Sequence, residues 1–350
     1  MKIRANHLTF VRLLALPLFC GLLYGDDNAR WLALVLGTAT GCTDFIDGYL
    51  ARREGPTVLG ALMDPVADKI FVIVASLPLT DLGWIPWWLV VAILLREYTV
   101  TALRSSFEVR GLRLPSSYLA KVKTWVQMIG IGLIVLARAH VAWVMFVVLI
   151  ALTLGTVAAL IIVARTQHRL HRGAVYGIFC FGGTLLLYWQ GADTGLTLAL
   201  FSLILAFTWI SAMPYYINAA SMFIGGGFRP FDATRILGAT ALPLLAVTTM
   251  VHTEAHTVPL IAVLVTEGAQ AGLDNLLSHH QAAMSDARWT CRTLTIAVLL
   301  GLSLVSVFWA SVLPWVAAAI SLVETSLAFY GGRHIYLAPP ERLATPQKSV

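Results

Sequence analysis

Long apolar runs recur along the whole chain and constrain its fold more than any other feature. Hydrophobic residues make up 58% of the 350 residues and charged residues only 12%, whereas about 25% of the residues in a soluble domain are charged. A run of roughly 18 or more apolar residues is long enough to span a bilayer. Because the backbone groups of a span have to bond within their own segment, such spans are helices. The sequence therefore predicts an all-α, polytopic membrane protein.

The apolar runs predict twelve membrane-spanning helices in two sets of six. The first set lies near residues 8–24, 30–50, 59–79, 85–107, 117–137 and 141–164. The second set lies near residues 174–190, 195–216, 235–252, 257–277, 293–312 and 314–331. A basic stretch at 165–173 separates the sets, so we expect a domain at 1–168, a second domain at 173–337 and a tail at 338–350. Twelve spans bring nearly all lysines and arginines to one side. Since positive residues stay cytoplasmic, we expect both termini in the cytoplasm.

Four aspartates gather where the second predicted span ends and the third begins. Asp44 and Asp47 are three residues apart, and Asp64 and Asp68 are four apart, so each pair shares a helix face. The short connecting loop makes the two helices antiparallel neighbours, and we expect the four carboxylates to converge near their cytoplasmic end. An aspartate at the centre of a span costs ~2.5–3.5 kcal/mol on insertion scales, and less near the interface. Carboxylate oxygens suit Mg²⁺ or Mn²⁺. The cluster therefore predicts two such ions, which would clamp a pyrophosphate.

The spacing of these residues resembles the signature of the CDP-alcohol phosphotransferase family. The matching pattern is Asp44-x2-Asp47-Gly48-x2-Ala51-Arg52, followed by Gly60-x3-Asp64-x3-Asp68. The loop from Arg52 to Gly60 is one residue shorter than is usual in the family, so we expect the ligands to be unaffected and the contacts of the loop to differ. The resemblance covers about residues 5–165 and implies a six-helix bundle with a polar cavity open to the cytoplasm, usually in a homodimer. Residues 173–337, with about six further helices, show no such resemblance.

The resemblance also implies roles for individual residues. The four aspartates would bind metal, and Asp68 would be the general base that deprotonates the acceptor alcohol. The residues expected to border the CDP moiety are Asn6, Thr9, Gly48, Ala51, Arg52 and Gly60. Arg12 belongs to the same opening motif as Asn6 and Thr9, and the alternative for these three is helix capping or interfacial anchoring. The expected reaction transfers a phosphatidyl group from CDP-diacylglycerol to an alcohol and releases CMP. The expected partners are these substrates and membrane lipids, with no nucleic acid.

Further motifs bear on the acceptor alcohol. The stretches Arg96-Glu97, Thr101–Arg104 and Lys121–Thr124, the last followed by Gln127, resemble the branch of the family that makes phosphatidylglycerophosphate. The basic residues that we expect to bind the phosphate of glycerol 3-phosphate are Arg104, Lys121, Lys123 and Arg165. The alternative for these bases is attraction of anionic lipid headgroups. Another acceptor, as in a cardiolipin synthase or an inositol phosphate transferase, also stays open.

Other interpretations of the aspartates compete with this one. Salt bridges to Arg52, Arg53 and Lys69 would neutralise three charges but do not explain the paired spacing. An ion-coupled transporter would use the acids as its ion site, yet it gives no reason for Ala51 and Gly60 at their positions. An intramembrane prenyltransferase also binds Mg²⁺-pyrophosphate through aspartates, but its two motifs lie on well-separated helices. A catalytically inactive scaffold would not need the intact ligand set.

The second half carries one polar segment that invites a functional interpretation. Glu267 and Asp274 share a face of the predicted span at 257–277, and His279 and His280 follow it. Intramembrane carboxylates are functional candidates by default. These four residues therefore form a candidate second site, which would bind a metal ion or equally the lipid product. The alternative is hydrogen bonding between helices of an accessory bundle.

Overall fold

The computed structural model describes residues 5–54, 57–112, 118–138, 142–167, 172–189, 193–280, 286–306 and 308–337. Within these ranges, several side chains lie outside the description, chiefly those of 44–54 and 118–125. The described part contains thirteen α-helices. Their bounds are α1 Ala5–Leu23, α2 Asp27–Glu54, α3 Val58–Asp81, α4 Trp87–Glu108, α5 Tyr118–Arg138, α6 Ala142–Gln167, α7 Arg172–Trp189, α8 Asp193–Ile210, α9 Met213–Gly226, α10 Pro230–His252, α11 Thr257–His279, α12 Asp286–Val305 and α13 Leu313–Tyr336.

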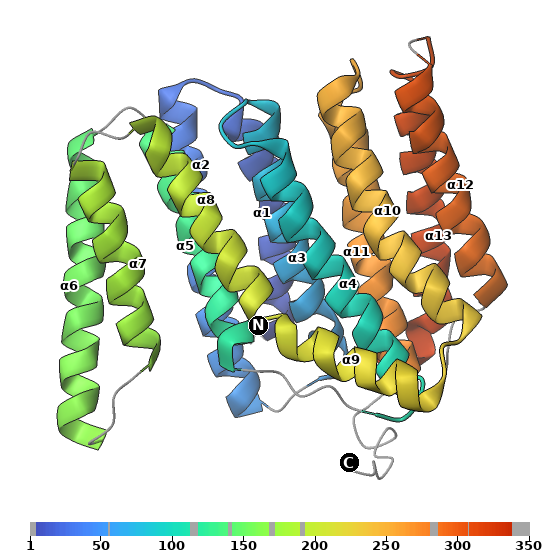
Figure 1. The fold of residues 1–350 in the computed structure, drawn as a ribbon, viewed down its shortest axis with the longest axis horizontal. Helices are drawn as coiled ribbons and strands as arrows, with labels where there is room; N and C mark the ends of the chain where they lie inside the picture. Colours follow the sequence, from blue (N-terminus) through green and yellow to red (C-terminus); the bar gives the residue numbers. More distant parts are fainter. Residues whose placement is uncertain are drawn as a thin grey trace.

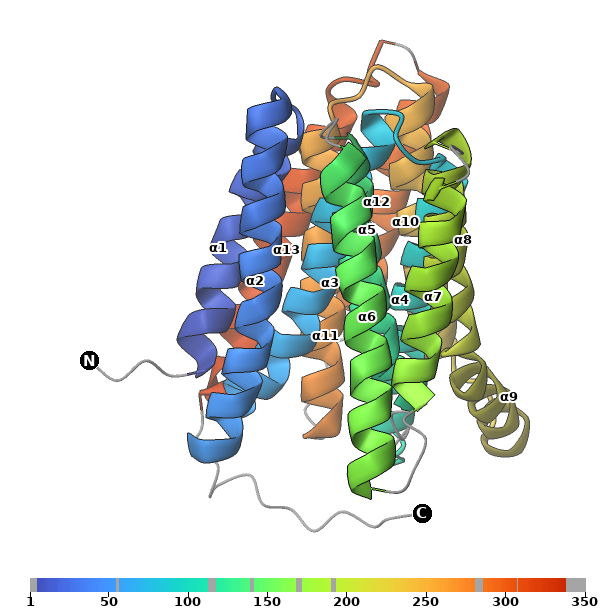
Figure 2. The same cartoon turned by 90° about the vertical axis from the view of Figure 1, so that its left-hand side faces the viewer.

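Twelve of these helices run along one common direction, up and down, and α9 lies across one end of the bundle (Figure 1). The start of α1 and the end of α13 lie at the same end of the molecule, as the even number of predicted spans requires (Figure 2). Seven stretches of the described residues are both long and apolar enough to cross a membrane. The all-α prediction is confirmed, and each of the twelve predicted spans overlaps one of the twelve aligned helices. That all twelve cross the membrane stays a prediction.

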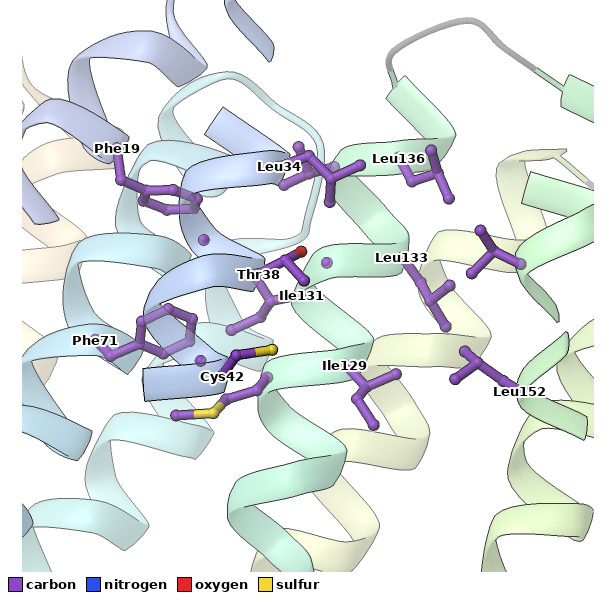
Figure 3. A pocket seen from close by; sticks show the side chains of 16 residues that line it. Phe19, Leu34, Thr38, Cys42, Phe71, Ile129, Ile131, Leu133, Leu136 and Leu152 are labelled. Carbon is purple, nitrogen blue, oxygen red and sulfur yellow. The ribbon is translucent and has the colours of Figure 1, made fainter. Parts of the chain in front are cut away.

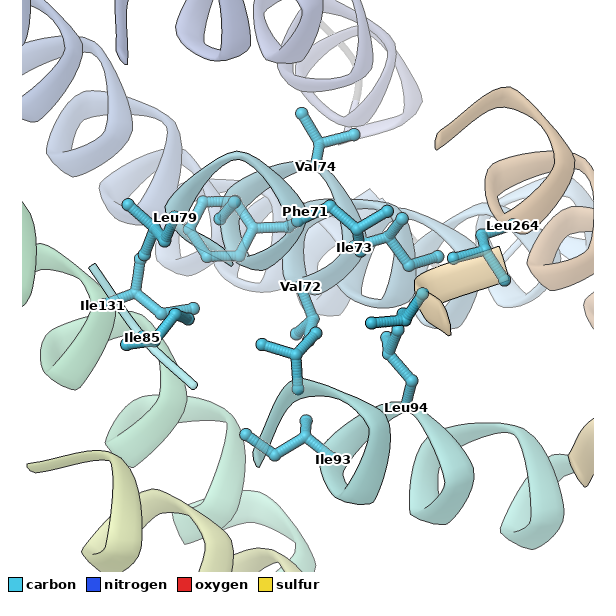
Figure 4. Close-up of a cluster of buried hydrophobic side chains, with 14 of the residues drawn as sticks. Phe71, Val72, Ile73, Val74, Leu79, Ile85, Ile93, Leu94, Ile131 and Leu264 are labelled. Atoms are coloured by element: carbon cyan, nitrogen blue, oxygen red, sulfur yellow. The ribbon is translucent and has the colours of Figure 1, made fainter. Parts of the chain in front are cut away.

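Helices α3 and α4 form the centre of the bundle. Residues 71–80 of α3 are all buried, and their apolar side chains pack with those of α4, α5 and α11 (Figure 4). The turn between the two helices contains Gly83, whose φ of +69° is a left-handed conformation that glycine adopts without a steric penalty. Pro86 then precedes the first residue of α4. This tight connection makes α3 and α4 antiparallel neighbours.

The two halves of the chain pack against each other. Helix α10 contacts α4, α11 contacts both α3 and α4, and α8 contacts α5. Helices α6 and α7 pair at the opposite edge of the molecule from α10–α13 (Figure 1). The second half therefore covers the central helices of the first half on one side.

The predicted single span at 195–216 is wrong in its second part. The helix ends at Ile210, and a new helix, α9, begins at Met213. Pro214 lies at the start of α9 and has no backbone N–H to donate to the preceding turn, so it favours a break there. Within the break, the hydroxyl of Ser211 donates to the carbonyl of Thr208 at 2.8 Å. The predicted span at 293–312 is also too long, because α12 ends at Val305.

Candidate active site

The first turn of α3 is hydrogen-bonded to the start of α1. Thr57 caps α3, and its Oγ1 accepts a hydrogen bond from the backbone N–H of Gly60 at 3.0 Å. The same Oγ1 lies 3.2 Å from both side-chain polar atoms of Asn6. A Cβ atom on residue 60 would approach Asn6 Oδ1 and Thr57 Oγ1 to 3.0 Å, which is tighter than ordinary packing. Glycine at position 60 therefore allows the two helices to meet, and it brings together two residues predicted to border the nucleotide.

Two of the four aspartates face α1 from the next turns of α3. The hydroxyl of Thr9 donates to Asp64 Oδ1 at 3.3 Å. Arg12 Nη1 lies 3.7 Å from Asp68 Oδ1. The Arg12 side chain is only 1% exposed, whereas that of Asp68 is 39% exposed. Thr9 and Arg12 share a face of α1, as Asp64 and Asp68 share one of α3, so the opening motif contacts the α3 part of the acidic motif.

The rest of the acidic motif lies on α2. The side chains of Asp44, Asp47, Gly48, Ala51 and Arg52 are outside the described residues. The backbone of α2 packs along α1 and α5 and ends at Glu54, three residues before the cap of α3. This short connection keeps the end of α2 near the start of α3, and the convergence of all four carboxylates stays a prediction.

The described carboxylates are chemically suited to a divalent cation. Asp64 is exposed and Asp68 half-buried, one helical turn apart, and both offer the hard oxygen ligands that Mg²⁺ and Mn²⁺ prefer. Among the described side chains, no three histidine, cysteine or acidic residues gather closely enough to hold an ion. A complete ligand set would therefore need the carboxylates of α2.

The residues predicted to bind the acceptor phosphate are spread over three helices. Arg104 lies on α4, where its Nη2 donates to the hydroxyl of Tyr215 at 3.0 Å and its Cζ is 5.2 Å from the centre of that ring. Lys121 and Lys123 lie on the first turns of α5, and their side chains are outside the description. Arg165 is exposed near the end of α6, and α6 lies at one edge of the molecule (Figure 1). Tyr215 was not among the predicted site residues.

A large apolar cavity lies beside the second predicted span. Its volume is about 350 Å³, and α1, α2, α3, α5 and α6 supply its walls (Figure 3). Gly37, Gly41 and Cys42 line the cavity from α2. Cys42 lies two residues before Asp44 in the sequence. A Cβ atom at Gly37 would come within 2.9 Å of the Phe19 ring, so this glycine allows α1 and α2 to approach closely. The cavity is suited to an acyl chain rather than to a polar ligand.

The carboxylates of the candidate second site bind arginines. Glu267 lies 2.7 Å from Arg292 of α12. Asp274 accepts two hydrogen bonds from Arg235 of α10, at 2.9 and 3.0 Å. These contacts are typical of interhelical ion pairing, so the metal hypothesis for this segment gains no support from the geometry.

The two histidines of the candidate second site lie at the end of α11. His279 Nδ1 is 2.8 Å from Glu108 of α4, and the ring of His280 lies edge-on to that of His279 at 5.1 Å. Burial lowers the pKa of His280 below its ordinary value of 6.5, and the charge of His279 lowers this pKa further. His279 therefore joins α11 to α4, and the contacts found for both histidines are with residues other than Glu267 and Asp274.

Comparison with known proteins gives the class to which this fold and these motifs belong. Residues 2–157 match the family model for CDP-alcohol phosphatidyltransferase. A "probable phosphatidylglycerophosphate synthase" of Mycobacterium tuberculosis is 43% identical over 146 residues, which are 39% of this chain and 69% of that protein. The chain therefore belongs to the CDP-alcohol phosphatidyltransferase family, and it is an integral membrane protein.

Other relatives carry a more specific name. The CDP-diacylglycerol–glycerol-3-phosphate 3-phosphatidyltransferase of Rickettsia bellii is 37% identical over 136 residues, covering 37% of this chain and 74% of that protein. The protein of the same name from Bacillus subtilis is 31% identical over 145 residues, covering 37% and 75%. No solved structure matches this chain. The family match ends within α6, so α7–α13 lie beyond it.

Proposed function

We propose that this protein transfers the phosphatidyl group of CDP-diacylglycerol to glycerol 3-phosphate, giving phosphatidylglycerophosphate and CMP. The observation that carries the proposal is the pairing of the acidic motif with the opening motif at one end of the bundle: Asp64 with Thr9, and Asp68 with Arg12. The names of the relatives in Rickettsia and Bacillus support the choice of acceptor. Family membership also favours an enzyme over an ion-coupled transporter.

The family is generally dependent on a divalent metal, and the oxygen donors of α3 fit Mg²⁺ or Mn²⁺. Asp44, Asp47, Asp64 and Asp68 would hold the metal, with two ions as the expected number. Bound metal would neutralise the pyrophosphate and stabilise the departing CMP. Asn6, Thr9, Gly48, Ala51, Arg52 and Gly60 would border the nucleotide.

The chain's own groups supply positioning and proton transfer. Asp68 is exposed enough to reach a substrate hydroxyl, and the buried Arg12 guanidinium forms an ion pair with its carboxylate at 3.7 Å. Asp68 then takes the proton of the acceptor hydroxyl as the oxygen attacks the lipid-side phosphorus, and the bond from that phosphorus to CMP breaks. Arg104, Lys121, Lys123 and Arg165 are the proposed ligands of the acceptor's phosphate.

The lipid end of the donor needs an apolar environment next to the polar site. The apolar cavity between α2, α5 and α6 offers about 350 Å³ of such space. Apolar side chains line its walls, among them Phe19 of α1 and Leu152 of α6 (Figure 3). We assign this cavity to an acyl chain of CDP-diacylglycerol. The acidic motif, the first residue of α1 and the last of α13 share one end of the bundle, which we assign to the cytoplasmic side. The homodimer expected from the family stays a prediction.

The test is an acceptor panel with purified protein, CDP-diacylglycerol and Mg²⁺. Labelled glycerol 3-phosphate, inositol phosphate and phosphatidylglycerol are offered separately, and the lipid products are separated. We expect a new labelled lipid product from glycerol 3-phosphate alone, and no conversion of the labelled phosphatidylglycerol to another lipid. Incorporation of another alcohol while glycerol 3-phosphate stays in the aqueous phase would overturn the choice of acceptor.

A matched pair of variants tests the role of Asp68. Loss of a general base reduces the rate by about 10²–10⁴-fold, so Asp68→Asn should lose activity to that extent. Asp81→Asn alters an exposed aspartate at the other end of α3, which accepts a hydrogen bond from Tyr24 at 2.7 Å, and should retain activity. Full activity of Asp68→Asn would remove this residue from the mechanism.

A further inference from the structure

The junction of α8 and α9, which we call the α8–α9 corner (Thr208–Tyr216), is packed on the middle of α4. Trp209 Nε1 donates to the carbonyl of Ala92 at 3.1 Å, and the hydroxyls of Tyr216 and Thr99 are 2.6 Å apart. The rings of Trp209 and Tyr216 are stacked, with centres 5.9 Å apart. The corner lies beyond the family match, whereas Ala92 and Thr99 lie within it. A segment from the second half thus contacts α4 at successive turns.

The corner also completes a buried polar network around Arg96. Arg96 donates to the Thr208 carbonyl and to the Ser211 hydroxyl, each at 3.0 Å, and to Glu97 at 3.1 Å. Gln127 of α5 donates to both Glu97 and Thr208, at 3.2 Å. Buried polar groups of this kind hold their helices in one arrangement when their partners are supplied. The corner therefore helps to fix α4 against α5, the helix that carries Lys121 and Lys123.

Arg104 lies eight residues after Arg96, which is about 12 Å further along α4. Its Nη2 is bound to the hydroxyl of Tyr215, and its guanidinium lies over the same ring. The Tyr215 ring is itself buried against Val100 and Ala212, so it is a rigid anchor. Arg104 is only partly buried, and its Nε is a buried donor without a partner among the described residues. Tyr215 thus occupies one nitrogen of the guanidinium and leaves the others with hydrogen-bonding capacity.

From these contacts we infer that Tyr215 is a positioning residue for Arg104, and that the second half of the chain in this way completes the site for the acceptor's phosphate group. The inference rests on the proposed function, since Arg104 is one of the bases assigned there to glycerol 3-phosphate. A phosphate monoester binds best to a guanidinium fork that is already oriented. Tyr215 orients it by a hydrogen bond and by the face of its ring. The second half is then part of the acceptor site and not merely an attached bundle.

The test is a steady-state comparison of Tyr215→Phe with the wild-type full chain, with both substrates varied in turn. The phenylalanine keeps the ring and its packing but removes the hydroxyl. Because a hydrogen bond to a charged group contributes about 1.5 kcal/mol or more, we expect the KM for glycerol 3-phosphate to rise about tenfold. The KM for CDP-diacylglycerol and kcat should each stay within about twofold of wild type.

Two further variants separate positioning from general packing. Tyr216→Phe removes the neighbouring hydroxyl, which contacts Thr99 and not Arg104, and should leave both KM values unchanged. In an Arg104→Ala background, Tyr215→Phe should cause no further rise in the KM for glycerol 3-phosphate.

An unchanged KM for glycerol 3-phosphate in Tyr215→Phe, or an equal rise in the KM values for both substrates, would overturn the inference while leaving the proposed function intact. Failure of the wild-type protein to use glycerol 3-phosphate would instead overturn the proposed function and the inference with it.

Discussion

The ion pair between Arg235 and Asp274 makes a quantitative prediction about how the second half is held together. Both side chains are almost completely buried, with 2% and 1% of their surfaces exposed. Two hydrogen bonds of 2.9 and 3.0 Å join them, and the Arg235 guanidinium lies 4.1 Å from the centre of the Phe231 ring. Asp274→Asn removes the negative charge and leaves a buried guanidinium uncompensated. Breaking a buried pair in this way costs about 3–5 kcal/mol, and we expect that loss in the free energy of unfolding.

The assay is denaturant unfolding of the purified protein in mixed micelles, followed by the loss of helical circular dichroism. The control is Glu324→Gln. Glu324 is 2.7 Å from Arg288, but these side chains are 30% and 49% exposed. The free energy of unfolding of Glu324→Gln should therefore fall by less than about 1 kcal/mol. A double variant, Asp274→Leu with Arg235→Met, removes both charges and should recover most of the stability lost in Asp274→Asn. Equal losses in Asp274→Asn and Glu324→Gln would refute the argument from burial.

Three shorter predictions concern packing, pH and lipid binding. Gly272→Ala would push a Cβ atom into Val66 of α3 and should lower the free energy of unfolding by about 1–3 kcal/mol. Gly301→Ala, where a Cβ atom meets nothing within 4 Å, is the control and should cause no loss. Burial, and then the charge of the preceding histidine, lowers the pKa of His280 below 6.5, so folding opposes its protonation. The melting temperature should therefore fall as pH drops below 6.5 towards the lowered pKa, and it should fall less in His280→Gln. An equal fall in melting temperature with pH in the wild type and in His280→Gln would contradict this prediction. Gly41→Leu would fill part of the apolar cavity, where only a methionine sulfur lies within 4.0 Å of a Cβ atom. It should raise the KM for CDP-diacylglycerol several-fold and leave that for glycerol 3-phosphate unchanged, and an unchanged donor KM would argue against a lipid in the cavity.

Much of the fold follows from the apolar runs, because their length and the lack of charge determine where a helix can lie in a bilayer. The break at Ser211 was missed because hydropathy stays high through it, although Pro214 is a local signal that was available. Hydropathy reports whether a segment prefers lipid, and it does not report whether the helix turns. The short helix α9, which carries Tyr215, could not be separated from α8 on this basis alone.

The acidic site was predictable to the extent that its residues are close in sequence. The i, i+4 spacing of Asp64 and Asp68 placed both on one face of α3, and the opening motif pointed to Thr9 and Arg12, which the structure brings to them. Contacts between distant helices carry no such local signal. Arg235 is the first residue of the predicted span at 235–252, and only the packing of α10 on α11 shows that it is buried against Asp274.

The most direct test of the whole account is the release of CMP from CDP-diacylglycerol by the purified full chain. CMP and lipid product are measured together, with and without glycerol 3-phosphate and Mg²⁺, for the wild type and for Asp64→Asn. We predict equal amounts of CMP and phosphatidylglycerophosphate, no turnover when either the acceptor or the metal is left out, and a loss on the order of a hundredfold or more in Asp64→Asn. CMP release that needs neither acceptor nor metal, or that survives intact in Asp64→Asn, would contradict the account.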